Sequence, residues 1–200
     1  VCCVVNMKRS VSLFLLLFAP YTWASFAEAI SAYHQGQYNR AIHEFKQLAR
    51  VGDVASQYNL AYMYARGLGV ERDYGQAFTW FYAAAQRGDA ESQFHLAGLY
   101  EQGLGIKQSH EKALNWYRQS ALQGYLPAQI TVAGLYGIGL GVEHDAAQSW
   151  TWLSVADSQR TQPMIAEAKA LLQEQLSPQQ LQKAQHQAQI IIKQAWQTTN

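Results

Sequence analysis

The sequence is poor in the residues that build cross-linked or reactive sites. Its only cysteines are Cys2 and Cys3, both within an N-terminal segment that we expect to be removed. The mature chain would then contain neither a disulfide nor a cysteine metal site. Its six histidines show no pair at metal-binding spacing and no H-E-x-x-H motif. No nucleophile has an identifiable base beside it, so we predict no catalytic residue, no metal and no cofactor.

Charge of either sign is scarce as well. Charged residues make up 14% of the chain, the net charge is +1, and lysine and arginine form neither a block nor a stripe. A nucleic-acid partner is therefore not expected. Apolar residues make up 49%, a share that is typical of a folded globular chain.

No long apolar run is present, and the clearest short one lies near the N-terminus. Residues 11–18 are apolar but too few to span a bilayer as an ordinary helix. Lys8 and Arg9 precede this run, and small residues follow it at Ala24 and Ala27. A basic start, an apolar core and small residues in this order predict a secretory signal peptide, cleaved after Ala24 or Ala27.

These signals predict an exported protein. We expect residues 1–24 to be the signal peptide, with 1–6 upstream of the true start at Met7. Export without disulfides favours the bacterial periplasm, with secretion as the alternative, and no membrane association is expected after cleavage. An uncleaved N-terminal anchor is the other interpretation of the same pattern.

A unit of 36 residues occurs three times in succession, beginning at Asp53, Asp89 and Tyr125. Five residues recur in register in all three copies: Gln57, Gln93 and Gln129; Tyr64, Tyr100 and Tyr136; Gly67, Gly103 and Gly139; Gly69, Gly105 and Gly141; Trp80, Trp116 and Trp152. A fixed period of this size indicates a stack of identical supersecondary units. Such stacks offer extended surfaces for other molecules rather than a single chemical pocket.

Each unit has the local signals of two helices joined by a tight turn. Asp53 is suited to cap a first helix, and Gly67 is placed for a left-handed C-terminal cap. A second helix begins at Asp73, where Gln76 completes the spacing of a capping box; Asp145 and Gln148 repeat this spacing. The expected core face consists of Gln57, Leu60, Ala61 and Tyr64 on the first helix and Ala77, Trp80, Phe81 and Ala84 on the second.

The flanking segments have the features of end caps. Residues 25–52 have the pattern of one helix pair of tetratricopeptide type, and Ser177 with Gln180 marks the start of a polar-faced final helix. We therefore predict the following organisation: signal peptide 1–24, N-terminal helix pair 25–52, repeats 53–88, 89–124 and 125–160, and C-terminal capping helices 161–200.

The repeated residues carry a family resemblance. The pattern A-Q-x-x-L-(G/A)-x-x-Y-x-x-G-x-G-V, followed by a cap and A-x-x-W, resembles the Sel1-like repeat (SLR) family, a relative of the tetratricopeptide repeat (TPR). The resemblance covers residues 53–160. In the third unit Ser149 replaces an alanine and Arg160 replaces the exit glycine, which indicates that the array ends there. The resemblance implies an all-α fold, a right-handed α-solenoid of antiparallel helix pairs.

The resemblance also implies a function. It predicts a non-catalytic protein–protein interaction scaffold or adaptor in the bacterial cell envelope, with a protein or peptide partner bound in the concave groove. The alternatives are a cell-wall-related or β-lactam-binding enzyme, and a secreted effector acting on host proteins. The cysteines of the family members linked to β-lactams are absent from this sequence.

One row of residues is a candidate for partner binding. It lies on the first helix of each unit, nearly opposite the core face, and the resemblance places it on the concave surface. The candidate residues are Tyr58, Tyr62, Arg66, Phe94, Gln102 and Ile130. An exposed apolar strip of this kind usually marks a binding site. In the alternative interpretation, a flanking helix such as the one after Ser177 folds back and covers it.

Overall fold

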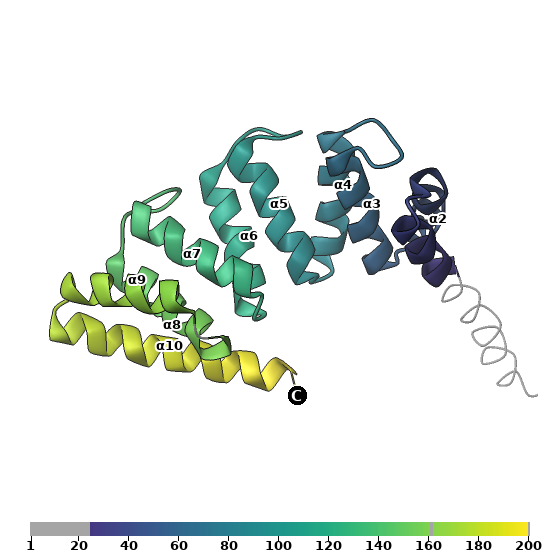
Figure 1. The fold of residues 1–200 in the computed structure, drawn as a ribbon. Coiled ribbons are helices and arrows are strands. Elements are labelled where there is room, and N and C mark those ends of the chain that lie inside the picture. The colour runs from purple at the N-terminus through teal and green to yellow at the C-terminus, as the bar shows by residue number, and fades with distance from the viewer. Residues whose placement is uncertain (1–24, 161, 200) are drawn as a thin grey trace, which may run out of the picture. The chain divides into compact units, whose positions relative to one another are not determined.

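The computed structural model describes residues 25–160 and 162–199, with side chains up to residue 195. The predicted signal peptide lies outside these residues. Within the described residues all regular structure is helical, as Figure 1 shows, and the predicted α-solenoid of helix pairs is confirmed. The chain divides into two compact units, residues 1–73 and 74–200, and each is described by itself.

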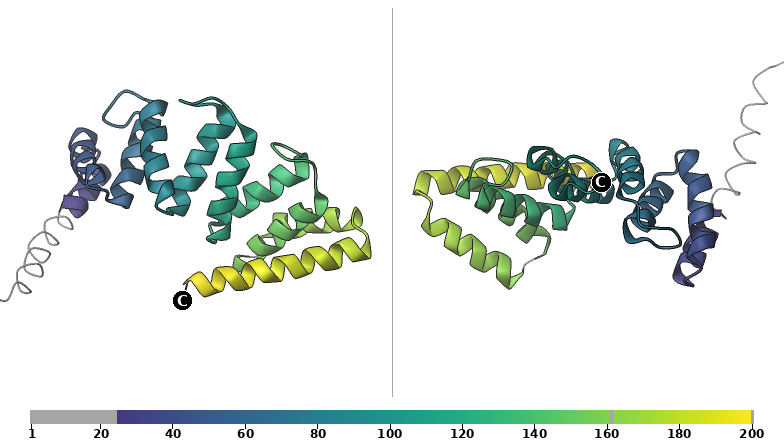
Figure 2. Two further views of the ribbon diagram at one scale, coloured as in Figure 1. Left: turned by 180° about the vertical axis from the view of Figure 1, so that it is seen from behind. Right: turned by 90° about the horizontal axis from the view of Figure 1, so that it is seen from above.

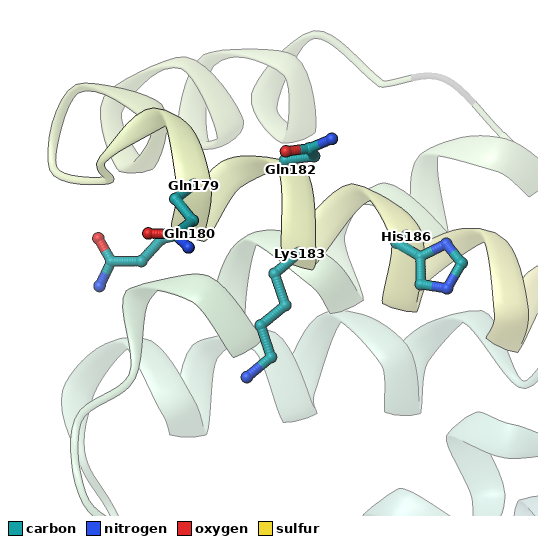
Figure 3. A pocket seen from close by; sticks show the side chains of 5 residues that line it. All are labelled: Gln179, Gln180, Gln182, Lys183 and His186. Carbon is teal, nitrogen blue, oxygen red and sulfur yellow. The ribbon is translucent and has the colours of Figure 1, made fainter.

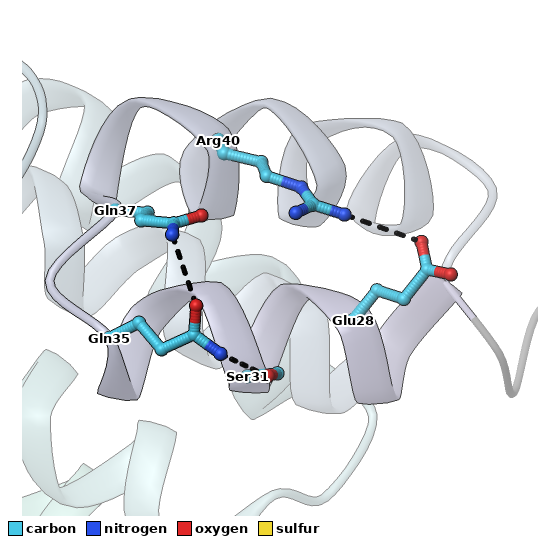
Figure 4. A network of polar contacts seen from close by, with 5 residues as sticks. All are labelled: Glu28, Ser31, Gln35, Gln37 and Arg40. Atoms are coloured by element: carbon cyan, nitrogen blue, oxygen red, sulfur yellow. Dashed lines mark hydrogen bonds and ion pairs between the residues drawn. The ribbon is translucent and has the colours of Figure 1, made fainter.

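The first unit contains three helices in its described part. Residues 25–34 are helical, followed by α2 (Tyr38–Arg50) and α3 (Val54–Arg66). Phe45 of α2 is fully buried, and its ring meets Phe26 edge to face with 6.0 Å between centroids. A polar network covers the turn before α2 (Figure 4): the Gln37 amide donates to Gln35, whose amide donates to Ser31, each over 3.0 Å.

The second unit contains the other seven described helices. They are α4 (Tyr74–Gln86), α5 (Ala90–Gln102), α6 (His110–Leu122), α7 (Leu126–Ile138), α8 (Ala146–Gln159), α9 (Pro163–Glu174) and α10 (Pro178–Thr199). From α4 to α8 each helix packs on the next. The last two helices depart from this order, because both α9 and α10 pack on α8 (Figure 2).

Most predicted helix caps are present. The Asp53 carboxylate accepts from the backbone N–H of Ser56 over 2.7 Å, and Ser177 and Gln180 form a reciprocal capping box. The capping box predicted at Asp145 and Gln148 is only half right: the Asp145 carboxylate accepts from the Gln148 backbone N–H, but the reciprocal bond is wrong. The backbone N–H of Asp145 donates to the Tyr136 carbonyl at 2.9 Å, so the inter-helix turn already occupies the donor that the glutamine side chain would cap.

The turn glycines have two different roles. The first glycine of each turn adopts the predicted left-handed cap, with φ 69° at Gly67, 70° at Gly103 and 72° at Gly139. The second glycine also has positive φ, but it additionally lies against backbone. A Cβ on Gly105 would lie 2.4 Å from the carbonyl carbon of Tyr74, at the start of α4. The turn therefore packs on the second helix of the preceding repeat, which only a residue without a side chain allows.

The repeated glutamine joins neighbouring repeats. Gln93 and Gln129 are buried, and each side-chain amide donates over 3.1 Å to a backbone carbonyl near the end of the preceding helix, at Ala85 and Ala121 respectively. The Gln129 carbonyl oxygen accepts in turn from the Gln159 side chain at 3.0 Å. Each of these carbonyls also accepts from a backbone N–H in the following turn, at Gly88 and Gly124 over 3.0 Å, so the glutamine provides its second hydrogen bond.

The predicted core is confirmed except at Tyr64, which is half-buried, and at the first two tryptophans. Leu60, Ala61, Ala77 and Phe81 are buried as expected, and Trp80 is only half-buried. Trp116 is half-buried too, whereas Trp152 is 3% exposed. The third tryptophan differs because α8 contacts α7, α9 and α10, while the helices before it have fewer neighbours in the second unit.

Candidate functional site

An apolar groove of about 420 Å³ lies among α7, α8 and α9 in the second unit. The residues that line it are Ile130, Ala133, Gly134, Gly137, Ile138, Ser149, Leu153, Met164, Ile165, Ala168, Leu171, Leu172 and Gln175. None of these side chains is charged. The volume is in the range of protein binding sites, and the few polar groups stand among apolar neighbours.

Large apolar side chains are left open at this groove. Ile138 is 71% exposed, Met164 69% and Leu171 57%. They come from two helices and line one cavity, so they form a shared surface rather than scattered single residues. A contiguous apolar surface of this kind is a candidate interaction site.

The helical period of both walls explains the groove. On α7 the lining residues Ile130, Gly134 and Ile138 follow one another at intervals of four, which places them on one face. On α9, Met164, Ala168 and Leu171 are spaced by four and three and also share a face. The space above Gly134, between the two isoleucines, is open, since a Cβ added there would meet no atom within 4 Å.

α9 is fixed in place by contacts with α8. The Lys169 ammonium forms a 2.9 Å ion pair with Asp157, and both side chains are largely shielded from water. The same ammonium lies 5.3 Å from the ring centroid of Trp150. Ile165, at 2% exposed, anchors the start of the helix. The wall of the groove is therefore a docked helix rather than a loose end.

Replacing Lys169 with methionine tests this attachment. We expect a loss of about 1 kcal/mol of stability, because the ion pair is partly shielded and its removal leaves the Asp157 carboxylate without its cation. Hydrogen exchange should accelerate in α9 before it does in α7. Lys183→Met on the exposed face of α10 is the matched control and should leave exchange in α9 unchanged. Equal effects of both substitutions would contradict the proposed role of the ion pair.

Three of the predicted site residues lie in the first unit, on α3. Tyr58 and Tyr62 are half-buried, and their rings stack with centroids 6.3 Å apart. The guanidinium of Arg66 lies 5.4 Å from the centroid of the Tyr62 ring. Burial, followed by the proximity of Tyr62, raises the pKa of Tyr33 nearby. The structure thus brings these three residues together as one aromatic and cationic row.

The other three predicted residues lie in the second unit, in different surroundings. Gln102 is exposed and Ile130 lines the groove. Phe94 is half-buried rather than freely exposed, because its ring packs against Tyr117 and Tyr125 at centroid distances of 5.2 and 5.3 Å. Phe94 therefore contributes to packing, and its removal would cost stability as well as surface.

Tyr117 is the buried member of this aromatic cluster. Its side chain is 4% exposed, and its hydroxyl donates to a carboxylate oxygen of Glu101 over 2.9 Å. Burial, and then this hydrogen bond, raise the pKa of the Tyr117 hydroxyl. The hydroxyl stays protonated and acts as a donor that ties α6 to α5.

The sequence analysis missed the second wall of the groove. It placed Ile130 on the binding row but described residues 163–174 only as part of a cap. The helical spacing of Met164, Leu171 and Leu172 was the available signal. The alternative that a flanking helix lies against the row applies in part at α7, where the helix beside the row is α9 rather than the one after Ser177.

Other surfaces of the described residues are weaker candidates for a binding site than the groove. Figure 3 shows a polar hollow on α10 whose labelled side chains, among them Lys183 and His186, all come from one helix. In the described part of the chain no three histidine or acidic side chains gather as metal ligands would. Among the described helices, none has the length and apolar content that crossing a bilayer requires.

Comparison with known proteins gives consistent matches. A family model described as Sel1 repeat matches residues 54–89, 90–125 and 127–156, about half of the chain. The crystal structure of a protective antigen from uropathogenic Escherichia coli strains, described as displaying an SLR fold, is similar with a TM-score of 0.76 and 31% identity over 87% of this chain. A Sel1 repeat protein from Oxalobacter formigenes is similar with a TM-score of 0.63 and 28% identity over 68% of this chain.

The match covers only part of these neighbours. The chain spans 38% of the Escherichia coli protein and 55% of the Oxalobacter formigenes protein. A search of curated proteins returned no match.

Proposed function

The chain belongs to the Sel1 repeat family, and on this premise we propose that it is a non-catalytic scaffold that binds a protein partner in the groove between α7 and α9. Sel1 repeat proteins are generally protein-interaction scaffolds. The observation that carries the proposal is the exposure of Ile138, Met164 and Leu171 on one apolar surface. Covering these side chains with a partner would contribute favourable free energy in proportion to the apolar area removed from water.

The chemistry of the lining favours binding over catalysis. Ser149 and Gln175 are its only polar side chains, and the other lining residues carry no acid or base. General acid–base catalysis needs a titratable group within hydrogen-bond reach of the substrate. A groove of this composition provides apolar contact area and few directional bonds, as the centre of a protein interface does.

The row on the first helices extends the proposal. Tyr58, Tyr62 and Arg66 provide aromatic and cationic side chains of the types that are enriched at interface hot spots. We propose that these residues are a contact surface of the first unit by itself, and that Phe94 and Gln102 are secondary contributors to binding in the second unit. Tyr58, Tyr62 and Phe94 are half-buried, so these aromatic side chains have less area to gain from binding than the groove offers.

We propose an envelope location for this scaffold. The basic, apolar and small-residue order of residues 8–27 supports export, and the similar Escherichia coli protein is described as a protective antigen. N-terminal sequencing of the protein isolated from its native host should give Ser25 or Glu28 as the first residue. A chain that retains Met7 in the cytoplasmic fraction would contradict export.

In-cell photo-crosslinking tests the binding proposal. A benzophenone amino acid placed at Met164 or at Leu171 should give adducts with one protein, because both side chains face the groove opening. The same probe at Leu122, which is 45% exposed on α6 and outside the groove, is the matched control. Adducts of equal yield and identity at all three positions would contradict a specific groove site.

A further inference from the structure

We infer that the occupant of the groove is an amphipathic α-helix of the partner protein, which inserts an uncharged apolar face between α7 and α9. This inference rests on the proposed function and specifies its partner. It depends on three properties of the groove: the state of its backbone groups, the arrangement of its three helices, and the absence of charge from its lining.

The backbone of the groove offers nothing to an extended peptide. Both walls are α-helices, whose interior amide and carbonyl groups already bond within the helix. A peptide that binds as a β-strand needs a free sheet edge. Against this lining, an extended chain would bury N–H and C=O groups with only Ser149 and Gln175 as polar side-chain partners. A helix avoids this cost because its own backbone bonds are satisfied internally.

The two outer walls of the groove do not close on each other. α7 and α9 each pack closely on α8, whereas α7 and α9 do not pack closely on each other. Helices in contact lie about 8–10 Å apart between axes, so a further helix laid between α7 and α9 would complete a four-helix arrangement opposite α8. Gly134 is exposed and has open space above it, which lets such a helix approach α7 closely.

The absence of charge from the lining determines which face of the partner helix can enter the groove. No lysine, arginine, aspartate or glutamate lines the groove. A charged side chain inserted there would lose its hydration without gaining a counter-charge. The inserted face must therefore be apolar, with side chains at intervals of three and four residues to follow the ridges of Ile130, Ile138 and Leu171. Polar residues of the partner remain on its outer face.

A binary-patterned peptide library provides the test. Displayed peptides of about 16 residues, near the length at which isolated helices become stable, carry apolar residues either at helical spacing or in strict alternation, with identical composition. The library is selected on the mature protein, and the best binders are resynthesised for titration. We expect helical-pattern peptides to be enriched and to gain helical circular dichroism on binding.

The variants use two equivalent helix ends. Ile138 and Leu122 are the last residues of α7 and α6, and both are exposed, but only Ile138 lines the groove. Ile138→Lys should weaken binding of the selected peptide by about tenfold or more, and Leu122→Lys should leave it unchanged. A lysine is tolerated at the end of a helix, so both variants should fold and melt alike.

Several outcomes would overturn the inference. Enrichment of the alternating peptides, or of neither pattern, would mean that a helix is not the preferred occupant. Concentration-dependent dimers of the mature protein that Ile138→Lys abolishes would identify a second copy instead. Saturable binding of a synthetic peptide of residues 1–24 in the groove, with no binding of either library pattern, would identify the predicted signal peptide as the occupant. Saturable binding of a fluorescent lipophilic dye with no peptide binding would identify a small apolar ligand.

The two proposals fail separately. If in-cell adducts form at Met164 and Leu171 but the library enriches alternating peptides, the scaffold function stands and the helical occupant is wrong. If no groove-specific adduct forms in cells, the proposed function itself fails, whatever the library selects.

Discussion

Gly105→Ala is expected to lower the free energy of unfolding by about 3–5 kcal/mol, from the sum of backbone strain and overpacking. The φ angle of this glycine is +70°, a region in which an alanine is strained. Its Cβ would also lie 2.4 Å from the Tyr74 carbonyl carbon and 2.5 Å from the carbonyl oxygen. The contacted atoms are backbone and cannot rotate away, so the turn must separate from α4.

Thermal unfolding measured by circular dichroism checks this prediction. A loss of this size should lower the melting temperature by on the order of 10 °C in a chain of this length. Gly88→Ala is the matched control, because Gly88 has φ +90° but a Cβ there would meet nothing within 4 Å. It should cost only about 1–2 kcal/mol of strain. Equal losses for the two variants would show that the contact with Tyr74 contributes nothing.

Gln129→Ala is expected to cost about 2–4 kcal/mol, since it combines a cavity with broken buried hydrogen bonds. Gln129 is fully buried, and its amide donates to the Ala121 carbonyl while its oxygen accepts from Gln159. Alanine would leave the carbonyl at the end of α6 without this donor and would weaken the junction between the second and third repeats. Chemical denaturation followed by circular dichroism measures the loss.

Gln159→Ala is the matched control for this junction. Gln159 is exposed, and its replacement removes one of the two hydrogen bonds without creating a buried cavity. Its expected cost is about 1 kcal/mol or less. In the double variant the loss should be smaller than the sum of the single losses, because both substitutions break the same bond. Strict additivity would contradict the direct coupling of the two side chains.

The candidate site was only partly predictable. Ile130 was placed on the binding row because helical period fixes which residues of one helix share a face. Met164 and Leu171 carry the same periodic signal, but period does not say which helix faces which. The approach of α9 to α7 depends on the contacts of Lys169 with Asp157 and Trp150, twelve and nineteen residues away in sequence.

Phe94 also shows that helical period does not predict which helices face each other. Its position opposite the core face of α5 suggested exposure. The structure places it beside Tyr117 of α6 and Tyr125, so that aromatic contacts between neighbouring elements half-bury it. The helical period of a sequence predicts the direction in which a side chain points from its own helix axis. Its burial depends on which side chains a neighbouring helix places in that direction.

The sequence alone determined the repeat, the helix pairs, the cap at Asp53 and the left-handed glycine at Gly67, because each depends on interactions within a few residues of chain. Only the tertiary structure decided that Gly105 touches the backbone of Tyr74, that Gln129 bonds across the repeat junction, and that α9 lies beside α7 to form the groove. The physical reason is the range of the forces involved. Caps and turns are set by local hydrogen bonds and φ preferences, whereas close approach and burial are set by how whole helices pack.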